Sequence, residues 1–188
     1  MRFTRISYNS PKDAPAPPGP LETLLGCHLR IRHFMQLSRT LADAHGVPHR
    51  EIAEAAEDIF YHFSHALPLH HADESETLFP RLRTQDSLVC EAAETMVEQH
   101  QAIDELAAVL LSLCASLSRQ PQRLPSVADR LSQVTCALDQ IFAAHLLLEE
   151  TVVFLAFSES LTSTQLEEMT REMHLRRQPP LGTIHLVR

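Results

Sequence analysis

Apolar residues recur every three or four positions from about residue 21 onward, which is the spacing of one face of an α-helix. The stripe Phe63, Leu67, His70, Glu74 and Leu78 steps by four, three, four and four residues and is typical of the chain. No run alternates between apolar and polar residues as a half-buried strand would. The pattern predicts four long helices and a shorter fifth, at residues 21–44, 49–82, 87–118, 126–157 and 165–177.

Turn-forming residues separate these predicted helices. Gly46-Val47-Pro48 ends the first helix, and Thr162 with Gln165 forms a capping box before the fifth. Pro68 lies inside the second helix, where it removes a backbone donor. We expect either a kink or a break into two segments at this proline, and the sequence leaves both open.

The helix pattern also predicts the domain organisation. Four long helices joined by short turns pack most economically as an up-down-up-down bundle, so we expect an all-α fold. With 188 residues, the chain fits one domain. We expect a Pro-rich, flexible tail at 1–20, the four-helix bundle at 21–158, and a short C-terminal helix with a tail at 159–188.

Composition excludes several classes of partner. The net charge is −8, and Lys12 is the single lysine, so no basic stripe exists to bind nucleic acid. The longest uninterrupted apolar run is too short to cross a bilayer, and the first residues lack the apolar stretch of a secretory signal. We therefore expect no membrane association and a cytoplasmic protein.

The four cysteines do not form a metal-binding or disulfide pattern, because none occurs in a CxxC pair. Cys90, Cys114 and Cys136 are expected to be small buried hydrophobic residues. Cys27 precedes a candidate ligand, His28, but adjacent helical positions point about 100° apart. We do not expect Cys27 to bind a metal.

Two segments about seventy-five residues apart carry the same motif, a histidine four residues before a glutamate. The pairs are His70 with Glu74 and His145 with Glu149. Four residues make one helical turn, so each pair projects from one face of its helix. In contrast, Glu150 lies roughly 140° around the helix from His145 and is not expected to share its face.

A histidine also lies near the middle of each long helix, among apolar residues. Buried imidazoles need partners, and two facing buried carboxylates would repel each other unless one takes up a proton. Cations between the helices would satisfy both demands. The candidate metal ligands are therefore His28, His70, Glu74, His100, His145 and Glu149.

The donor set limits the choice of metal. Imidazole and carboxylate ligands without thiolate suit iron, manganese or zinc. If both glutamates bridge two ions, each ion keeps an open position, which favours redox-active iron over the closed tetrahedron of structural zinc. No catalytic side chain is assigned, because the sequence has no nucleophile elbow, phosphate-binding loop or Ser/His/Asp arrangement.

Four segments carry a resemblance to a known family: LGCHLRIRHF, PLHHADESETLFPRL, VEQHQAIDEL and AAHLLLEETVVF. They resemble the four ligand helices of the hemerythrin-like, or HHE cation-binding, family over about residues 21–158. The resemblance implies a four-helix bundle with a non-heme diiron centre, two iron ions joined by an oxo or hydroxo bridge. Zinc or manganese remains an alternative, and the same six residues would be the ligands.

Two positions depart from the family pattern. Oxygen-carrying hemerythrins have a further histidine one turn before the third-helix ligand, where this chain has Met96, and Leu155 replaces an expected proline. The missing histidine implies a more open iron. That favours O2, NO or peroxide sensing or reactivity, iron handling, or iron–sulfur repair over stable O2 carriage.

The remaining candidates have weaker patterns. His71 is expected at the rim of the site or beside a ligand, and Asp104 either orients His100 or lies on the surface. An alternative function is a regulatory interaction module with a structural or vestigial metal, in which residues 165–177 dock on a partner or a second copy. A cap over the bundle end is the simpler role. Histidines expected to be ordinary surface or core residues are His33, His45, His49, His62, His65, His174 and His185.

Overall fold

The computed structural model describes residues 18–82 and 87–178. Most of the tail expected at 1–20, and the C-terminal residues from 179 with His185, lie outside this part. Every regular element of the described chain is helical, with no strand among them, which confirms the all-α fold.

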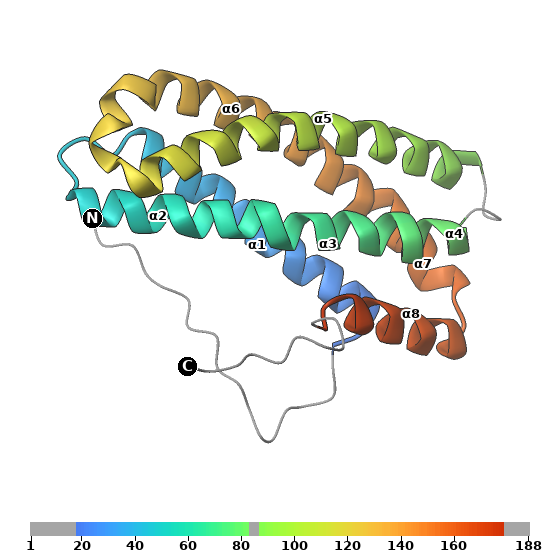
Figure 1. Ribbon diagram of the computed structural model, residues 1–188. Helices are drawn as coiled ribbons and strands as arrows, with labels where there is room; N and C mark the ends of the chain where they lie inside the picture. Colours follow the sequence, from blue (N-terminus) through green and yellow to red (C-terminus); the bar gives the residue numbers. More distant parts are fainter. Residues whose placement is uncertain (1–17, 83–86, 179–188) are drawn as a thin grey trace, which may run out of the picture.

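Four helical rods form an antiparallel bundle (Figure 1). The first and third rods pack against the second and the fourth. The first rod is α1 (Pro20–Ala42) and the third is α5 (Ser87–Arg119). The second contains α2 (His49–Tyr61), the π-helical turn η1 (His62–Ala66), α3 (Leu67–Ala72), the π-helical turn η2 (Asp73–Leu78) and α4 (Phe79–Leu82). The fourth contains the 3₁₀ turn η3 (Pro121–Arg123), α6 (Leu124–Leu148), the π-helical turn η4 (Glu149–Val153) and α7 (Phe154–Ser160).

Pro68 does not break the second rod, which is helical from residue 49 to residue 82. The π-helical turn η1 comes directly before the proline, and the Leu67 N–H donates to the His62 carbonyl, five residues back. A proline ring in a regular helix clashes with the carbonyl four residues earlier, and the wider turn relieves that clash. The rod therefore absorbs the proline as a local widening.

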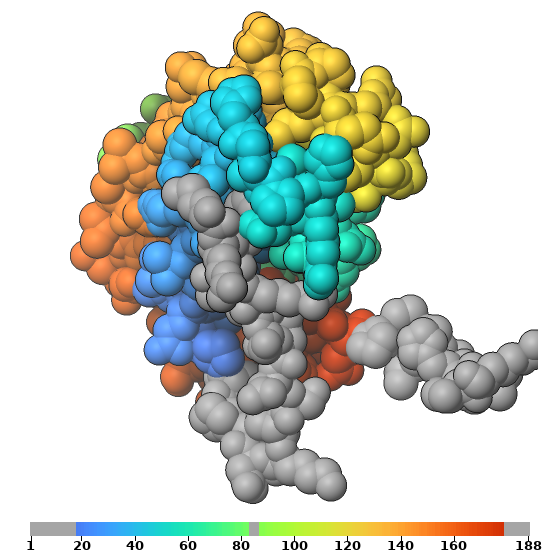
Figure 2. Space-filling model, turned by 90° about the vertical axis from the view of Figure 1, so that its left-hand side faces the viewer, coloured from blue at the N-terminus to red at the C-terminus, as the bar shows by residue number. Residues whose placement is uncertain are grey.

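The turns at one end of the bundle follow from local chemistry. Gly46 has φ of +72°, a left-handed conformation that glycine adopts without strain, and it lets α1 reverse into α2. Figure 2 looks onto this end of the molecule, where the α1–α2 turn lies beside the α5–α6 turn. Short turns here keep neighbouring rods antiparallel and align their middles.

The buried apolar residues form two separate clusters. Along α1, Leu24 belongs to one cluster and Ile31 to the other, with His28 between them. Along α5 the same order holds, with His100 between Met96 and Ile103. The bundle core is therefore interrupted by a polar layer at the level of these histidines.

By length and composition alone, two helices qualify as candidate membrane spans, Ser87–Arg119 and Pro121–Ser160. The sequence analysis had considered only uninterrupted apolar runs, none of which is long enough to cross a bilayer. The candidate spans are instead helices whose mean hydropathy is high although polar residues interrupt them. Core helices of a helical bundle pass the same test, and these two carry His100 and His145 into the bundle interior.

A fifth helix, α8 (Ser163–Arg176), lies across the end of the bundle against α1 and η2 (Figure 1). It begins at the predicted capping box, in which the Gln165 N–H donates to Thr162 Oγ1 over 3.3 Å. Met169 and Met173 are buried against the bundle. This packing is that of a cap.

Ion pairs complete the docking of α8. The Asp73 carboxylate in η2 is fully buried and accepts hydrogen bonds from both Arg176 and Arg177. Arg81 pairs with Glu172 of α8 at 2.7 Å. A buried carboxylate without such partners would be strongly destabilising, so α8 and η2 depend on each other.

Asp73→Ala should lower the free energy of unfolding by about 2 kcal/mol. The loss stays moderate because Arg176 and Arg177, whose side chains are 18% and 29% exposed, can still reach water. Urea unfolding of metal-free protein measures it. Glu76→Gln is the matched control: Glu76 pairs with the same Arg176 but is 66% exposed, so its loss should stay below about 0.5 kcal/mol. Equal effects of the two substitutions would contradict this account.

Candidate metal centre

The structure brings all six predicted ligand residues into the polar layer of the bundle. His28, His145, Glu74 and Glu149 are 0% exposed, and the most exposed of the six, His100, reaches only 7%. Each comes from a different turn of the four rods, so the layer exists only in the folded bundle.

The donor atoms of these residues fall into two groups, within each of which all lie within 4.8 Å of one another. The first group contains His28, His70, Glu74 and Glu149. The second contains Glu74, His100 and His145. Glu74 belongs to both groups.

The two oxygens of Glu74 face different groups. Its Oε1 lies 3.0 Å from His70 Nε2, and its Oε2 lies 2.7 Å from His100 Nε2. In the first group, His28 Nε2 lies 2.8 Å from Glu149 Oε2. Separations of about 3 Å are expected between neighbouring ligand atoms around one ion with bonds of about 2.1 Å.

Glu149 is less centrally placed than the sequence suggested. Its Oε2 is 2.8 Å from His28 Nε2. Its 4.0 Å distance from His145 Nε2 is close to the 3.9 Å of Glu74 Oε2, but the group that contains His100 includes Glu74 and not Glu149. The expectation of two bridging carboxylates therefore fits the position of Glu74, while Glu149 lies with the first group.

The donor atoms have no hydrogen-bond partners in the described chain. Nε2 of all four histidines and both oxygens of each glutamate are buried without one. Each such atom left unsatisfied costs about 1–3 kcal/mol. Converging imidazole nitrogens and carboxylate oxygens fit a divalent cation, so the residues present suit a metal site.

Both glutamates lie in π-helical turns. Glu74 is the second residue of η2, and Glu149 is the first residue of η4. The sequence analysis treated both His–Glu pairs as parts of regular α-helices and missed these turns. A π-helical turn changes the direction of its side chains and is frequent at functional sites.

Two ligand histidines are held by partners that the sequence analysis missed. Glu150 Oε1 lies 2.8 Å from His28 Nδ1 and accepts from Arg32 at 2.9 Å, so Glu150 faces α1. Gln99 Oε1 lies 3.0 Å from His145 Nδ1. An acceptor at Nδ1 keeps the proton there and leaves Nε2 free for a metal. The sequence did contain one indication of this contact: Arg32 lies one turn after His28, and a positive charge there favours an acidic residue from a neighbouring helix.

His71 lies beside a candidate ligand, which is one of the two positions expected for it. Its ring is stacked on that of His100 at a centroid distance of 3.9 Å. Asp104 is 65% exposed, and its Oδ1 lies 3.3 Å from His71 Nδ1. The suggestion that Asp104 orients His100 is therefore replaced by a contact with His71. His62 is buried and stacked on Phe34, outside both groups.

The cysteines are outside both groups. Cys27 Sγ accepts from Arg30 Nη2 at 3.0 Å and lies beside the His70 ring. Cys114 is buried as predicted, but Cys90 is half-buried and Cys136 is exposed, so the expectation was wrong for these two. Cys136 lies on the exposed face of α6, away from the buried residues Leu131, Leu138 and Phe142.

The groups of the layer differ in protonation without a cation. Burial opposes protonation of His70, but the nearby Glu74 carboxylate raises its pKa well above the ordinary value. Burial lowers the pKa of His28 and of His145 to about 4, so both imidazoles are neutral at neutral pH. Burial and the nearby Glu74 charge raise the pKa of Glu149 well above its ordinary value. Burial opposes ionisation of Glu74, but His70 and His100 hold its pKa well below the ordinary value. Without a cation one carboxyl thus keeps a proton, as the sequence argument anticipated.

The contribution of His62 to the stability of the metal-free protein should fall as the pH drops below 6.5. Burial lowers the pKa of His62 to about 3, so in this range the unfolded chain binds a proton that the folded chain does not. His62→Phe should reduce the slope of unfolding free energy by about 1.4 kcal/mol per pH unit between pH 6 and 4. Urea unfolding at several pH values measures the slope, with the exposed His49→Gln as control. Equal slopes for His62→Phe and the parent would refute this.

Comparison with known proteins agrees with this geometry. The chain is 30% identical over 169 residues to an uncharacterized protein of Haemophilus influenzae, an alignment that covers 85% of this chain and 90% of the relative. Residues 19–118, more than half of the chain, match the family described as "Hemerythrin HHE cation binding domain". Four of the six ligand candidates lie in this range, and the structure adds His145 and Glu149 from the fourth rod. The chain belongs to the hemerythrin HHE cation-binding family.

Proposed function

We propose that this protein holds a non-heme diiron centre, bridged by Glu74, that senses or reacts with O2, NO or peroxide, or that handles iron, including iron–sulfur repair. The observation that supports it is the position of Glu74, with one buried oxygen in each of two donor groups. This carboxylate is fully buried among imidazoles of three rods, where cations would satisfy both of its oxygens.

The donor set supports iron. Both groups combine imidazole and carboxylate and contain no thiolate, a set suited to iron and also to manganese or zinc. The second group offers three protein donors, which leaves open positions on an ion there. An open ion in a closed bundle suits ligand binding better than a purely structural role.

The residue at position 96 supports reactivity over oxygen carriage. Met96 is fully buried and belongs to an apolar cluster with Leu24 and Leu78, so α5 offers one imidazole to the layer. A thioether is a soft ligand and a poor replacement for a histidine at an iron with oxygen and nitrogen donors. One fewer protein ligand leaves the second group more accessible to small molecules.

The side chains of this chain hold and shield the centre. Bound iron would supply one-electron redox chemistry and a position for a small ligand. Glu150 and Gln99 orient the imidazoles of His28 and His145, and the apolar clusters on either side of the layer exclude water.

An interaction module with a structural metal has less support. Of the apolar residues of this helix that could dock on a partner, Met169 and Met173 are buried against the chain's own bundle, and Leu175 alone is exposed. We also propose a cytoplasmic location, which is supported by Cys27, Cys114 and Cys136, none of which forms a disulfide within the described part of the chain.

Purified protein grown with iron should contain close to two iron ions per chain and show the absorption of an oxo-bridged pair. Glu74→Ala should lose nearly all metal because it removes a donor from both groups. His62→Phe, a buried substitution outside both groups, should keep the parent content. Elemental analysis and absorption spectra measure both. A folded parent that stays colourless and metal-free would disprove the proposal.

A second substitution tests the two-group arrangement. His100→Ala removes a donor from the second group alone, so the content should fall to about one iron per chain. Circular dichroism checks that the variant remains helical. Loss of both ions, with the helical signal intact, would indicate that the groups do not fill separately.

The reduced protein should react with O2, NO or peroxide without forming a stable, reversible O2 complex. The physical reason is the open second group, in which Met96 provides no imidazole. Stopped-flow absorption after mixing with each ligand measures the reaction. Repeated, fully reversible O2 binding would instead make this protein an oxygen carrier.

A further inference from the structure

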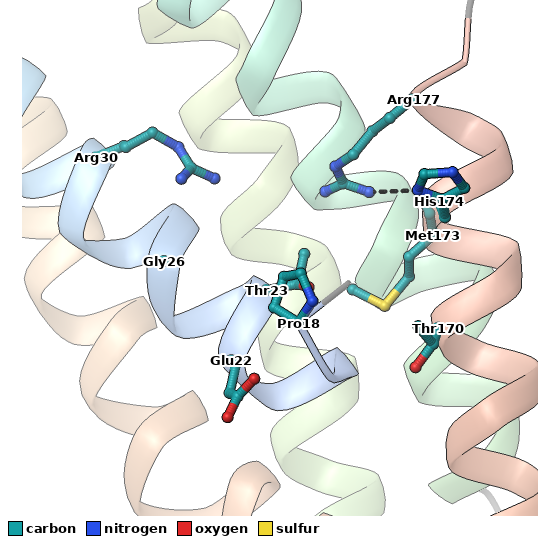
Figure 3. Close-up of a pocket in the computed structure, with 9 residues that line it drawn as sticks. All are labelled: Pro18, Glu22, Thr23, Gly26, Arg30, Thr170, Met173, His174 and Arg177. Atoms are coloured by element: carbon teal, nitrogen blue, oxygen red, sulfur yellow. Dashed lines mark hydrogen bonds between the residues drawn. The ribbon is translucent and has the colours of Figure 1, made fainter. Parts of the chain in front are cut away.

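A pocket of about 270 Å³ lies between the first half of α1 and α8, apart from both donor groups. Figure 3 shows the residues that surround it, with Gly26 and Arg30 on α1 and Met173 and Arg177 at the end of α8. The pocket exists because α8 folds back over the bundle, so it joins residues almost 150 positions apart in the sequence.

Gly26 opens the α1 side of this pocket. A Cβ at this position would meet Arg30 Nη1 at 3.6 Å, an ordinary contact, so a longer side chain would extend into the space. Glycine in the interior of a long helix reduces helix stability. The absence of a side chain at Gly26 leaves the space that forms this side of the pocket.

Two guanidinium groups extend into the pocket from opposite helices (Figure 3). Arg30 donates to Cys27 Sγ at 3.0 Å and has no carboxylate partner in the described part of the chain. Arg177 donates to the Met173 carbonyl and to Asp73, a carboxylate that it shares with Arg176. Each guanidinium has five N–H donors, so several remain available.

Three other polar groups around the pocket already have partners. Thr23 and Thr170 donate their hydroxyl protons to carbonyls of their own helices, at Gly19 and Leu166. Glu22 turns toward the start of α1, where its Oε2 accepts from the Gly19 N–H at 3.1 Å. The charged donors left for a ligand are therefore those of Arg30 and Arg177, with the exposed His174 imidazole beside them.

We propose that this pocket binds a small anion through a carboxylate or phosphate group held between Arg30 and Arg177. Planar guanidinium groups bind both kinds of oxyanion in a bidentate manner. Pro18 and Met173 supply apolar surface for the rest of a small organic molecule. This binding site does not depend on the metal centre.

Calorimetric titration of the full-length, metal-free protein tests the proposal, with inorganic phosphate in one arm and succinate in the other. Saturable binding of either anion is expected, and the arm that binds more tightly identifies the oxyanion. Arg30→Gln should weaken binding at least about tenfold because it removes a charge-assisted contact. Arg171→Gln, an exposed substitution of the same charge on α8 outside the pocket, should leave the affinity unchanged.

Gly26→Leu tests the pocket without changing any charge. Leucine favours helix and should fill the space, so binding should be lost while circular dichroism remains that of the parent. The absence of saturable binding by both anions, or equal affinities of Arg30→Gln and Arg171→Gln, would overturn the proposal. Unchanged binding by a folded Gly26→Leu protein would also overturn it.

Discussion

The buried carboxylates of Glu74 and Glu149 constrain the rest of this structure. Two acidic groups in the middle of an apolar bundle are unfavourable unless opposite charge surrounds them. Four imidazoles, one from each rod, surround these carboxylates, and their buried Nε2 atoms lie in the same layer without hydrogen-bond partners. Cation binding is the state in which all of these groups are satisfied, and the chain's family is a cation-binding one.

The layer determines features of the fold on both sides of it. It divides the apolar core into two clusters, and both of its glutamates lie in π-helical turns. Partners from neighbouring helices, Glu150 on His28 and Gln99 on His145, hold the imidazoles in place. These features are consistent with a site whose donors are positioned before a metal arrives.

The C-terminal helix connects the metal layer to the surface. Asp73, adjacent to Glu74, is fully buried and bound by Arg176 and Arg177, so docking of α8 fixes the turn that carries Glu74. Arg177 also lines the pocket between α8 and α1, where Arg30 contacts Cys27, which lies beside His70. The same short helix thus borders both an ionic support of the centre and a separate candidate binding site.

Sequence by itself determined the helices, the bundle and the six converging residues, because periodicity and one-turn spacing are local properties that the bundle preserves. Only the tertiary structure decided what crosses between rods. Glu150 was excluded by its angle to His145, yet it reaches His28 from the neighbouring rod. The exposure of Cys136 and the π-helical turns at Glu74 and Glu149 likewise depend on packing. Which face of a helix is exposed, and where the helix widens into a π-helical turn, is decided by the contacts with neighbouring rods.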